Sequence, residues 1–191
     1  MPGEDARSDG ELARLVAQGD RDAGAVLINR YQRLIRSFLL KLCGNRDLAD
    51  DIAQDTFVRM LEKADRYDPS YPMRTWLMTI ARRLSINFAR RADQRVGSTE
   101  YEGRQSQAEG PAETIEADDY RSSLRNMIDG ALQKLSEAQR SVMVLFHQQE
   151  LTIEEISDVM EMPIGTVKSH LHRARAAMRK TLGSQIEVMN V

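Results

Sequence analysis

The segment that most constrains this chain is residues 152–180, TIEEISDVMEMPIGTVKSHLHRARAAMRK. Its first part carries acidic side chains, whereas its second part carries Lys and Arg and no acid. Apolar residues recur three and four positions apart in both parts, which is typical of two helices joined by a tight turn. This is the pattern of a helix-turn-helix motif, whose second helix enters the major groove of DNA.

The spacing divides the second of these helices into a buried face and an outward face. The residues expected to be buried are Val167, Leu171, Ala174 and Met178, facing Ile153, Ile156 and Met160 of the first helix. The residues expected to point outward are Lys168, Ser169, His172, Arg173, Ala176 and Arg179. Lys168 and Arg173 suit guanine acceptors, while Ser169 and His172 suit shorter base contacts. The pattern also fits an amphipathic helical hairpin whose basic face is merely solvated.

The overall charge gives no general attraction to nucleic acid, because the formal net charge is -2. A DNA-binding protein of this composition must therefore segregate its charges. Hydrophobic residues make up 41% and charged residues 29% of the chain, as in a globular protein that is soluble in water. No apolar run approaches the ~20 residues of a membrane span, and the polar N-terminus does not resemble a signal peptide. The single Cys43 excludes an internal disulfide and suits a reducing cytoplasm.

The first half of the chain predicts several helices. Ser8 and Glu11 fit a capping box that starts a short helix, and Gly44 fits the left-handed cap of a longer one. A third helix, from Asp47 to about Ala64, has apolar positions at Leu48, Ile52, Phe57, Met60 and Leu61. Its other face shows Asp50, Asp51, Gln54 and Asp55. Without other information, a solvated helix surface is the simplest interpretation of these acids.

A proline-containing loop at residues 66–72 separates these helices from another that runs from Arg74 to about Gln94. Its apolar stripe includes Trp76, Leu77, Ile80, Ala81, Leu84 and Phe88. Basic side chains crowd the remaining surface, namely Arg82, Arg83, Arg90, Arg91 and Arg95. Because Trp76 lies on the apolar stripe, we interpret it as a core residue rather than a platform for stacking.

The composition then changes at residues 96–114, which are rich in Gly, Ser, Gln and Glu. Such a segment buries too little surface to offset its ordering entropy, so we expect a flexible, acidic linker. Beyond it, an amphipathic helix is marked by Tyr120, Leu124, Ile128, Leu132 and Leu135. Capping boxes at Ser136–Gln139 and Thr152–Glu155 open the next two helices. The sequence thus predicts an all-α protein with domains at 1–95 and 115–183, a linker at 96–114 and a frayed tail at 184–191.

Both domains resemble one family. The segments ALQKLSEAQRSVMVLFHQQELTIEE and EISDVMEMPIGTVKSHLHRARAAMRK closely resemble region four of bacterial sigma factors of the extracytoplasmic-function (ECF) type, group IV of the main sigma family. Upstream, DLADDIAQDTFVRMLEKADRYD followed by RTWLMTIARRLSINFARRADQR is similar to their region two. The two matches lie in the family's order, separated by a variable linker, and cover about Gly19 to Leu182.

The resemblance implies two roles for region two. It docks on the clamp helices of the large polymerase subunit, and the matching positions are Asp50, Asp51, Gln54, Asp55 and Arg59. It also recognises and opens the minus-ten element. The matching residues are Tyr71, Arg74, Arg82, Arg83, Asn87, Arg90 and Arg91. Opening DNA needs cations that follow the backbone and a pocket for an unstacked base, and Tyr71 suits stacking. The loop reads DPSYPMR where the family often carries a segment with Phe and Gly, so its base preference does not transfer.

Region four reads the minus-thirty-five element in this family and meets the flap region of the polymerase. The resemblance places Lys168, Ser169, His172 and Arg173 at bases, and Arg175 and Arg179 at phosphates. His172 departs from the bulkier residue expected at its position.

The linker passes near the RNA exit path in the family, where its acidity suits a mimic of nucleic acid; a solvated spacer is the other interpretation. A relaxed coil of the linker's length spans about 25 Å, and a fully stretched one ~60 Å. The minus-ten and minus-thirty-five elements lie about two turns of DNA apart, which is about 70 Å.

The expected function is therefore promoter-specific initiation with core RNA polymerase, in a stress or envelope response. The expected partners are core RNA polymerase, promoter DNA and an anti-sigma factor that holds the chain inactive, in the cytoplasm or near the membrane. We expect no enzyme activity, cofactor or small-molecule substrate, because the chain lacks a Gly-rich phosphate loop and a nucleophile with a base. We also expect no metal, because His170 and His172 point to different sides of one helix. The alternative is a regulator that binds DNA by its helix-turn-helix alone.

Overall fold

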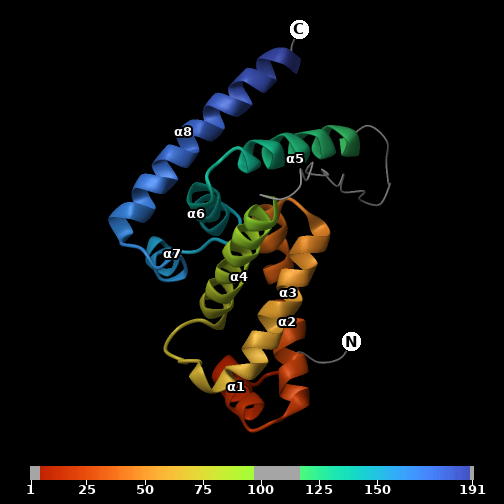
Figure 1. Cartoon of the computed structure of the whole chain (residues 1–191), viewed down its shortest axis with the longest axis vertical. Coiled ribbons are helices and arrows are strands. Elements are labelled where there is room, and N and C mark those ends of the chain that lie inside the picture. The colour runs from red at the N-terminus through yellow and green to blue at the C-terminus, as the bar shows by residue number, and fades with distance from the viewer. Residues whose placement is uncertain (1–4, 97–116, 190–191) are drawn as a thin grey trace. The chain divides into compact units, whose positions relative to one another are not determined.

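The computed structural model describes residues 5–96 and 117–189, and every regular element in these ranges is a helix (Figure 1). The prediction of an all-α protein is therefore confirmed for the described residues. They divide into two compact units. The first contains α1, η1, α4 and most of α2 and α3, and the second contains α5 to α8. The predicted linker lies outside the described residues, except that Val96 ends α4.

The first unit is a bundle of four α-helices and one turn of 3₁₀ helix. Its elements are α1 (Asp9–Ala17), α2 (Arg21–Cys43), α3 (Arg46–Glu62), η1 (Ala64–Arg66) and α4 (Met73–Val96). The predicted capping box is present at α1, where the Ser8 hydroxyl accepts from the Glu11 N–H and the Glu11 carboxylate accepts from the Ser8 N–H. Gly44 ends α2 with φ +64°, the left-handed conformation predicted for it.

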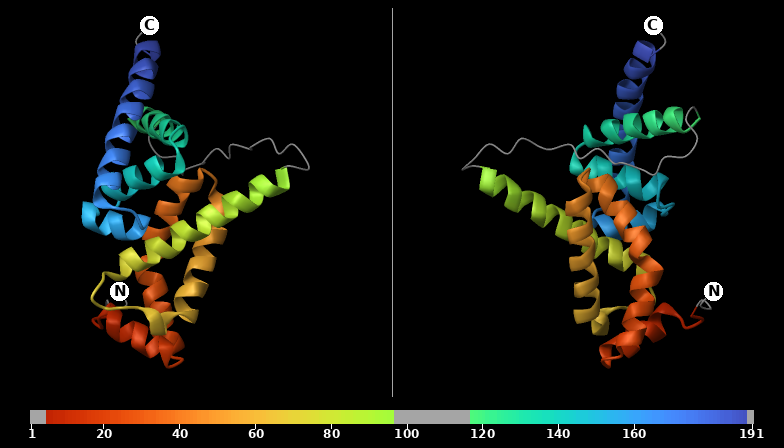
Figure 2. Two further views of the ribbon diagram at one scale, coloured as in Figure 1. Left: turned by 60° about the vertical axis from the view of Figure 1, so that its left-hand side comes forward. Right: turned by 90° about the vertical axis from the view of Figure 1, so that its right-hand side faces the viewer.

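The core of the first unit lies between α2, α3 and α4. Figure 2 shows α2 and α3 alongside each other, with α4 crossing them. Side chains with no exposed surface come from each helix, namely Leu27, Ile35, Phe38, Ile52, Met60 and Leu77. Burying a side chain of this size contributes roughly 1.5–3 kcal/mol. This packing fixes which faces of α3 and α4 remain outside.

The second unit consists of α5 (Ala117–Gln133), α6 (Glu137–His147), α7 (Ile153–Met160) and α8 (Ile164–Met189). Both predicted capping boxes are present, at Ser136 for α6 and at Thr152 for α7. Arg140 of α6 closes the C-terminal end of α5, because its guanidinium donates to the carbonyls of Leu132 (3.1 Å), Gln133 (2.9 Å) and Leu135 (3.1 Å). Helix α8 packs against α5, α6 and α7.

The sequence-based expectations for the end of α8 and for three apolar side chains differ from the structure. The predicted tail is helical as far as Met189, because α8 continues through Gly183, which a helix tolerates at a cost of about 1 kcal/mol. Leu61 of α3 is 40% exposed, and Leu124 and Ile128 of α5 are 41% and 37% exposed. An apolar stripe shows which side of a helix is apolar, but not how far its neighbours extend. In α5 the buried apolar side chains, Ala131 and Leu132, lie near the C-terminal end of the helix.

The cap of α7 generates a stability prediction. Replacing Thr152 by Ala removes the hydroxyl that accepts from the Glu155 N–H at 3.2 Å. We expect Thr152→Ala to lower the free energy of unfolding of the second unit by about 1 kcal/mol, as measured by denaturant titration. Thr152→Ser keeps the hydroxyl and is the matched control. Equal stability of the Ala and Ser variants would contradict this role.

Candidate nucleic-acid interface

The outward face of α8 arises from the way the helix buries its opposite face. Val167, Leu171, Ala174 and Met178 are each at most 7% exposed, in agreement with the predicted spacing. Ile156 and Met160 of α7 are buried as predicted, and Ile153 is half-buried. The residues predicted to point outward are all exposed, namely Lys168, Ser169, His172, Arg173, Ala176 and Arg179. We call this set the α8 basic face.

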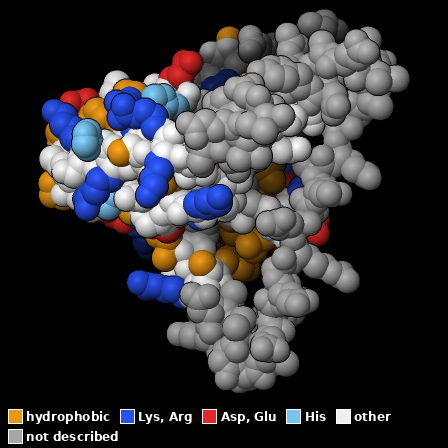
Figure 3. Space-filling view, turned by 90° about the horizontal axis from the view of Figure 1, so that it is seen from above, with side chains coloured by type: hydrophobic (Ala, Val, Ile, Leu, Met, Phe, Trp, Pro, Cys, Tyr) orange, Lys and Arg blue, Asp and Glu red, His pale blue; other side chains and the backbone are white. Residues whose placement is uncertain are grey.

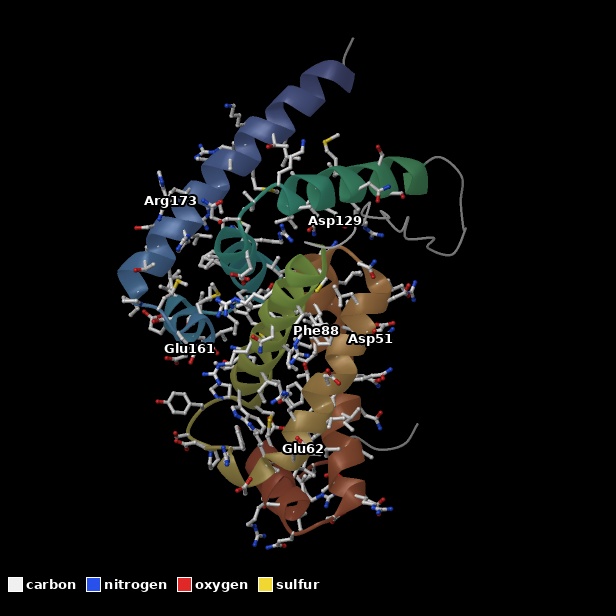
Figure 4. The ribbon with its side chains drawn as sticks, in the orientation of Figure 1. Asp51, Glu62, Phe88, Asp129, Glu161 and Arg173 are labelled. Carbon is white, nitrogen blue, oxygen red and sulfur yellow. The ribbon has the colours of Figure 1, made fainter. Side chains whose placement is uncertain are left out.

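The turn between α7 and α8 aims this face. Glu161 ends α7 in the left-handed conformation (φ 54°), where Gly is usual, and Figure 4 shows it at the turn. The Ser157 hydroxyl donates to the Met162 carbonyl at 2.6 Å, and the Met162 N–H donates to the Ser157 carbonyl at 3.2 Å. Pro163 then offers its carbonyl to the N–H groups of Thr166 and Val167, which starts α8. The sequence carried no signal for a left-handed Glu161.

The α8 basic face is positively charged and contains a shallow hollow. Lys168, Ser169, His172 and Arg173 line an open hollow in its surface. Figure 3 shows Lys, Arg and His side chains gathered on the side of the molecule where α8 lies, and Figure 4 shows Arg173 directed away from the helix bundle. Within the helix, the Ser169 hydroxyl donates to the Gly165 carbonyl at 3.0 Å, and Arg173 Nε donates to the Ser169 carbonyl at 3.3 Å. The terminal nitrogens of Arg173 remain directed to the surface, which suits contact with bases or phosphates.

Arg175 lies at the edge of this face nearest α6, and α6 holds it. Its Nε donates to Nε2 of His147 at 3.2 Å, and its guanidinium carbon lies 5.0 Å from the centre of the Phe146 ring. The His147 and Phe146 rings meet edge to face. Partial burial, and then the charge of Arg175, lower the pKa of His147. Arg175 and His147 lie 28 positions apart in the sequence, so no local sequence pattern indicated this cluster.

A second basic surface lies on α4 in the first unit. Arg83, Asn87 and Arg90 are exposed, and their spacing of four and three residues places them on one helix face. Arg91 is also exposed and Arg74 is partly exposed, whereas Arg82 is only 8% exposed. The other predicted cations, with Asn87, therefore form the accessible surface, whereas the Arg82 side chain is buried. Arg82 follows Ala81 at the boundary of the apolar stripe, a place where spacing alone assigns no side.

The loop at residues 67–72 presents an aromatic side chain beside this surface. The Tyr67 hydroxyl donates to the Tyr71 carbonyl at 2.7 Å, and the Tyr67 ring lies 5.3 Å from that of Trp76. The Asp68 side chain accepts from the Ser70 N–H at 2.9 Å, and the Asp68 carbonyl accepts from the Tyr71 N–H at 3.1 Å. These bonds tie down the loop backbone while the Tyr71 side chain stays 52% exposed. Tyr67 and Asp68, whose roles no sequence pattern indicated, thus order the loop together.

The acidic face of α3 is narrower than predicted. Asp51, Gln54, Asp55 and Arg59 are exposed, and Figure 4 shows Asp51 directed outward from α3. Asp50 instead accepts two hydrogen bonds from Arg36 of α2, each 2.7 Å long. The exposed Val58 (51%) and Leu61 (40%) lie next to the acids. No local pattern indicates the Asp50–Arg36 pair, because its partners lie 14 residues apart in different helices.

Metal-binding clusters and membrane-spanning helices are absent from the part of the chain that the structure describes. There, no three His, Cys, Asp or Glu side chains gather closely enough to hold a metal ion. Nor is any helix among the described residues both long and apolar enough to cross a membrane. The described residues present three polar surfaces, namely the α8 basic face, the α4 surface with its loop, and the acidic face of α3, called the acidic stripe below.

Family models match both units. The model of sigma-70 region 2 matches residues 27–95, and that of sigma-70 region 4 matches residues 125–178. The chain is 34% identical over 173 residues to the ECF RNA polymerase sigma factor SigW of Bacillus subtilis, a match that covers 87% of this chain and 92% of that protein. It is 32% identical over 166 residues to the RNA polymerase sigma factor YlaC of the same organism, covering 85% and 93%.

Solved structures give the same result. The sigma factor RpoE of Bartonella quintana, in complex with the anti-sigma factor NepR, matches with 25% identity and a TM-score of 0.69, covering 82% of this chain and 94% of that one. CnrH, in complex with the cytosolic domain of CnrY, has the same TM-score at 22% identity, covers 93% of this chain and 99% of its own, and supports the fold.

The cluster on α6 and α8 predicts a pH dependence. Arg175→Ala should raise the pKa of His147 toward its ordinary value of 6.5, as followed by NMR of the imidazole. Because the folded-state pKa of His147 is lowered, its neutral form contributes stability above pH 6.5 that is lost as the pH falls. The variant should therefore lose less stability on acidification than the parent chain. Arg179→Ala is the matched control, and an unchanged His147 titration in Arg175→Ala would contradict the contact.

Proposed function

We propose separate roles for the two units of this chain, which belongs to the sigma factors of the extracytoplasmic-function type. As a member of this family it is a transcription initiation factor that binds core RNA polymerase and directs it to promoters. The observation that carries the proposal is the match of each unit, in the correct order, to a separate region of one family. We further propose that the polymerase alone supplies catalysis and that this chain has no enzyme activity.

The second unit reads duplex DNA at the minus-thirty-five element. Its α8 basic face combines cations with hydrogen-bonding groups, and its second helix is the one that enters a major groove in helix-turn-helix proteins. Lys168, Ser169, His172 and Arg173 meet base edges, because they line the hollow near the N-terminal half of α8. Arg179 meets phosphate. Arg175 lies within reach of the same strand, held at the required edge by Phe146 and His147.

The first unit opens DNA at the minus-ten element. Arg83, Arg90 and Arg91 follow the backbone of the separated strand, together with Asn87 and Arg74. Tyr71 receives an unstacked base, because its ring is exposed while the loop backbone behind it is tied down. Stacking of a base on an aromatic ring contributes about 1–3 kcal/mol, enough to bias an opened base pair. Arg82 is buried and stays outside this exposed set.

The acidic stripe on α3 binds the clamp helices of the large polymerase subunit. Asp51, Gln54 and Asp55 form its exposed polar part, and Arg59 lies one turn further on. Asp50 acts through its pair with Arg36, which links α2 to α3 and so orients the stripe. The second unit contacts the polymerase flap. The domains assigned at 1–95 and 115–183 thus act on one polymerase, with residues 96–114 connecting them.

We also infer that an anti-sigma factor regulates this chain. RpoE of Bartonella quintana, which shares the fold, was solved in complex with the anti-sigma factor NepR. A partner of this type works by covering surfaces that the polymerase and DNA need. Because polymerase and promoter lie in the cytoplasm, we place this chain there, or near the membrane if its partner is anchored in it. A regulator that binds DNA without polymerase is not favoured, because it leaves the first unit without a role.

Separate loss of two functions tests the division of labour. In the full chain, Lys168→Ala with Arg173→Ala should reduce promoter-specific transcripts by about tenfold or more, since each base contact is worth about 1–3 kcal/mol of discrimination. Capture of core polymerase should remain unchanged. Asp51→Lys with Asp55→Lys should abolish capture of core polymerase, and promoter-specific transcripts should disappear with it because the chain then cannot direct the enzyme. Arg125→Ala, which removes an exposed cation from α5, is the control.

Two results would contradict this assignment. If core polymerase fails to bind the unmodified chain, the role in initiation is wrong. If the α8 double variant loses both polymerase capture and promoter selection while remaining folded, the faces have been assigned incorrectly. Unfolding is not expected, because exposed substitutions of this kind usually change stability by less than about 0.5 kcal/mol.

A further inference from the structure

The first helix, α1, lies against the segment that carries Tyr71. Helix α1 packs on η1, which directly precedes the loop at residues 67–72. Its Gly10 faces Pro69 of that loop, and a Cβ added at Gly10 would lie 3.0 Å from Cβ of Pro69. That spacing is tighter than a normal carbon–carbon contact of about 3.5–4.0 Å. The loop therefore rests on α1 at a point where only glycine leaves it undisturbed.

Helix α1 is itself fixed in place on both sides. Leu12 and Ala13 bury its apolar face, with 0% and 3% exposure. On its other side, the Asp9 carboxylate accepts from the guanidinium of Arg30 and from the hydroxyl of Tyr31, both in α2. Arg30 also donates to the carbonyls of Asp5 (2.9 Å) and Arg7 (3.2 Å), which precede the helix. The helix thus forms a rigid support rather than a loose N-terminal arm.

The charge on Asp9 reaches the loop as well. Burial raises the pKa of Tyr67, and the carboxylates of Asp9 and Asp68 raise it further. The Tyr67 hydroxyl donates to the Tyr71 carbonyl at 2.7 Å. The loop is thus held at two points, at Pro69 by packing against Gly10 of α1 and at Tyr71 by the hydrogen bond from Tyr67, which directly follows the η1 turn that α1 covers.

We propose that α1 braces the loop at residues 67–72, and that Asp9 and Gly10 are positioning residues for the capture of an unstacked base by Tyr71. This role of α1 deepens the role given above to the first unit and rests on it. Helix α1 lies outside residues 27–95, the part matched by the region 2 model, so this support comes from a segment that the family match does not cover. Displacing the brace moves the Tyr71 backbone while leaving the α8 basic face and the α3 stripe untouched.

The test uses Gly10→Val and Asp9→Asn in the full chain. The first variant pushes Pro69 away, and the second weakens the attachment of α1 to α2. Gly130→Val is the matched control, because Gly130 is also helical and has nothing within 4 Å of an added Cβ. Trp76 is the only tryptophan and contacts Tyr67, so its fluorescence reports on the loop directly. We expect its emission to shift in Gly10→Val and Asp9→Asn, and to stay unchanged in the control.

The functional measurement is the rate of promoter opening by the reconstituted polymerase. Both variants should open duplex promoter at least about fivefold more slowly, the lower limit for losing a base–aromatic stack. A template with mismatched bases at the minus-ten element should restore most of this loss, because its bases are already unpaired. Polymerase capture should not change. A merely structural role would slow opening on both templates equally, and that result would overturn the proposal, as would unchanged Trp76 emission and opening in both variants.

Tyr71→Ala separates this proposal from the function on which it rests. If Tyr71→Ala opens duplex promoter at the normal rate, the assignment of Tyr71 to base capture is wrong. A shifted Trp76 emission in Gly10→Val would in that case still support the brace. If Tyr71→Ala slows opening and Gly10→Val and Asp9→Asn behave like Gly130→Val, the capture stands and the brace is refuted.

Discussion

The second unit depends on the burial of one stripe along α8. Val167, Leu171, Ala174 and Met178 recur at spacings of four, three and four residues, and the helices α5, α6 and α7 cover them. Each large apolar side chain buried in this way contributes roughly 1.5–3 kcal/mol. A rotation of α8 that exposed the stripe would forfeit this energy and bury Lys168 and Arg173 without partners, which is costly. The outward direction of the basic face is thus a consequence of packing.

Short-range hydrogen bonds fix where the helices begin and how the turns and loops between them run. The caps at Ser136 and Thr152 fix where α6 and α7 begin, and the Ser157–Met162 bonds fix the turn into α8. In the first unit, Tyr67 holds the backbone of Tyr71 while Asp9 fastens α1 to α2. Several of these hydrogen bonds pair backbone N–H and carbonyl groups that would otherwise lack a partner at helix ends and in loops. Each unit therefore presents its proposed DNA-binding surface on a scaffold that hydrogen bonds and packing already fix in the absence of DNA.

Features governed by local rules were predictable from the sequence. Periods of three and four residues located the buried and exposed sides of α8, and side-chain capping patterns located three helix starts. Contacts between distant residues were not predictable in this way. Asp50 pairs with Arg36, Arg175 pairs with His147, and Arg82 is buried. Each of these depends on how separate helices meet. Leu61, Leu124 and Ile128 were misjudged since periodicity does not show where a covering helix ends. Which residues bind DNA and polymerase remains a prediction.

Centrally, we propose that the two units hold promoter DNA at separate places and only with polymerase. Hydroxyl-radical footprinting on a promoter transcribed by the reconstituted enzyme, combined with permanganate probing of unpaired thymines, tests this most directly. We expect two protected patches about two helical turns, or roughly 70 Å, apart. Reactive thymines should appear only at the downstream patch, and both signals should require core polymerase. A single protected patch, or equal protection by the chain without polymerase, would contradict this mechanism.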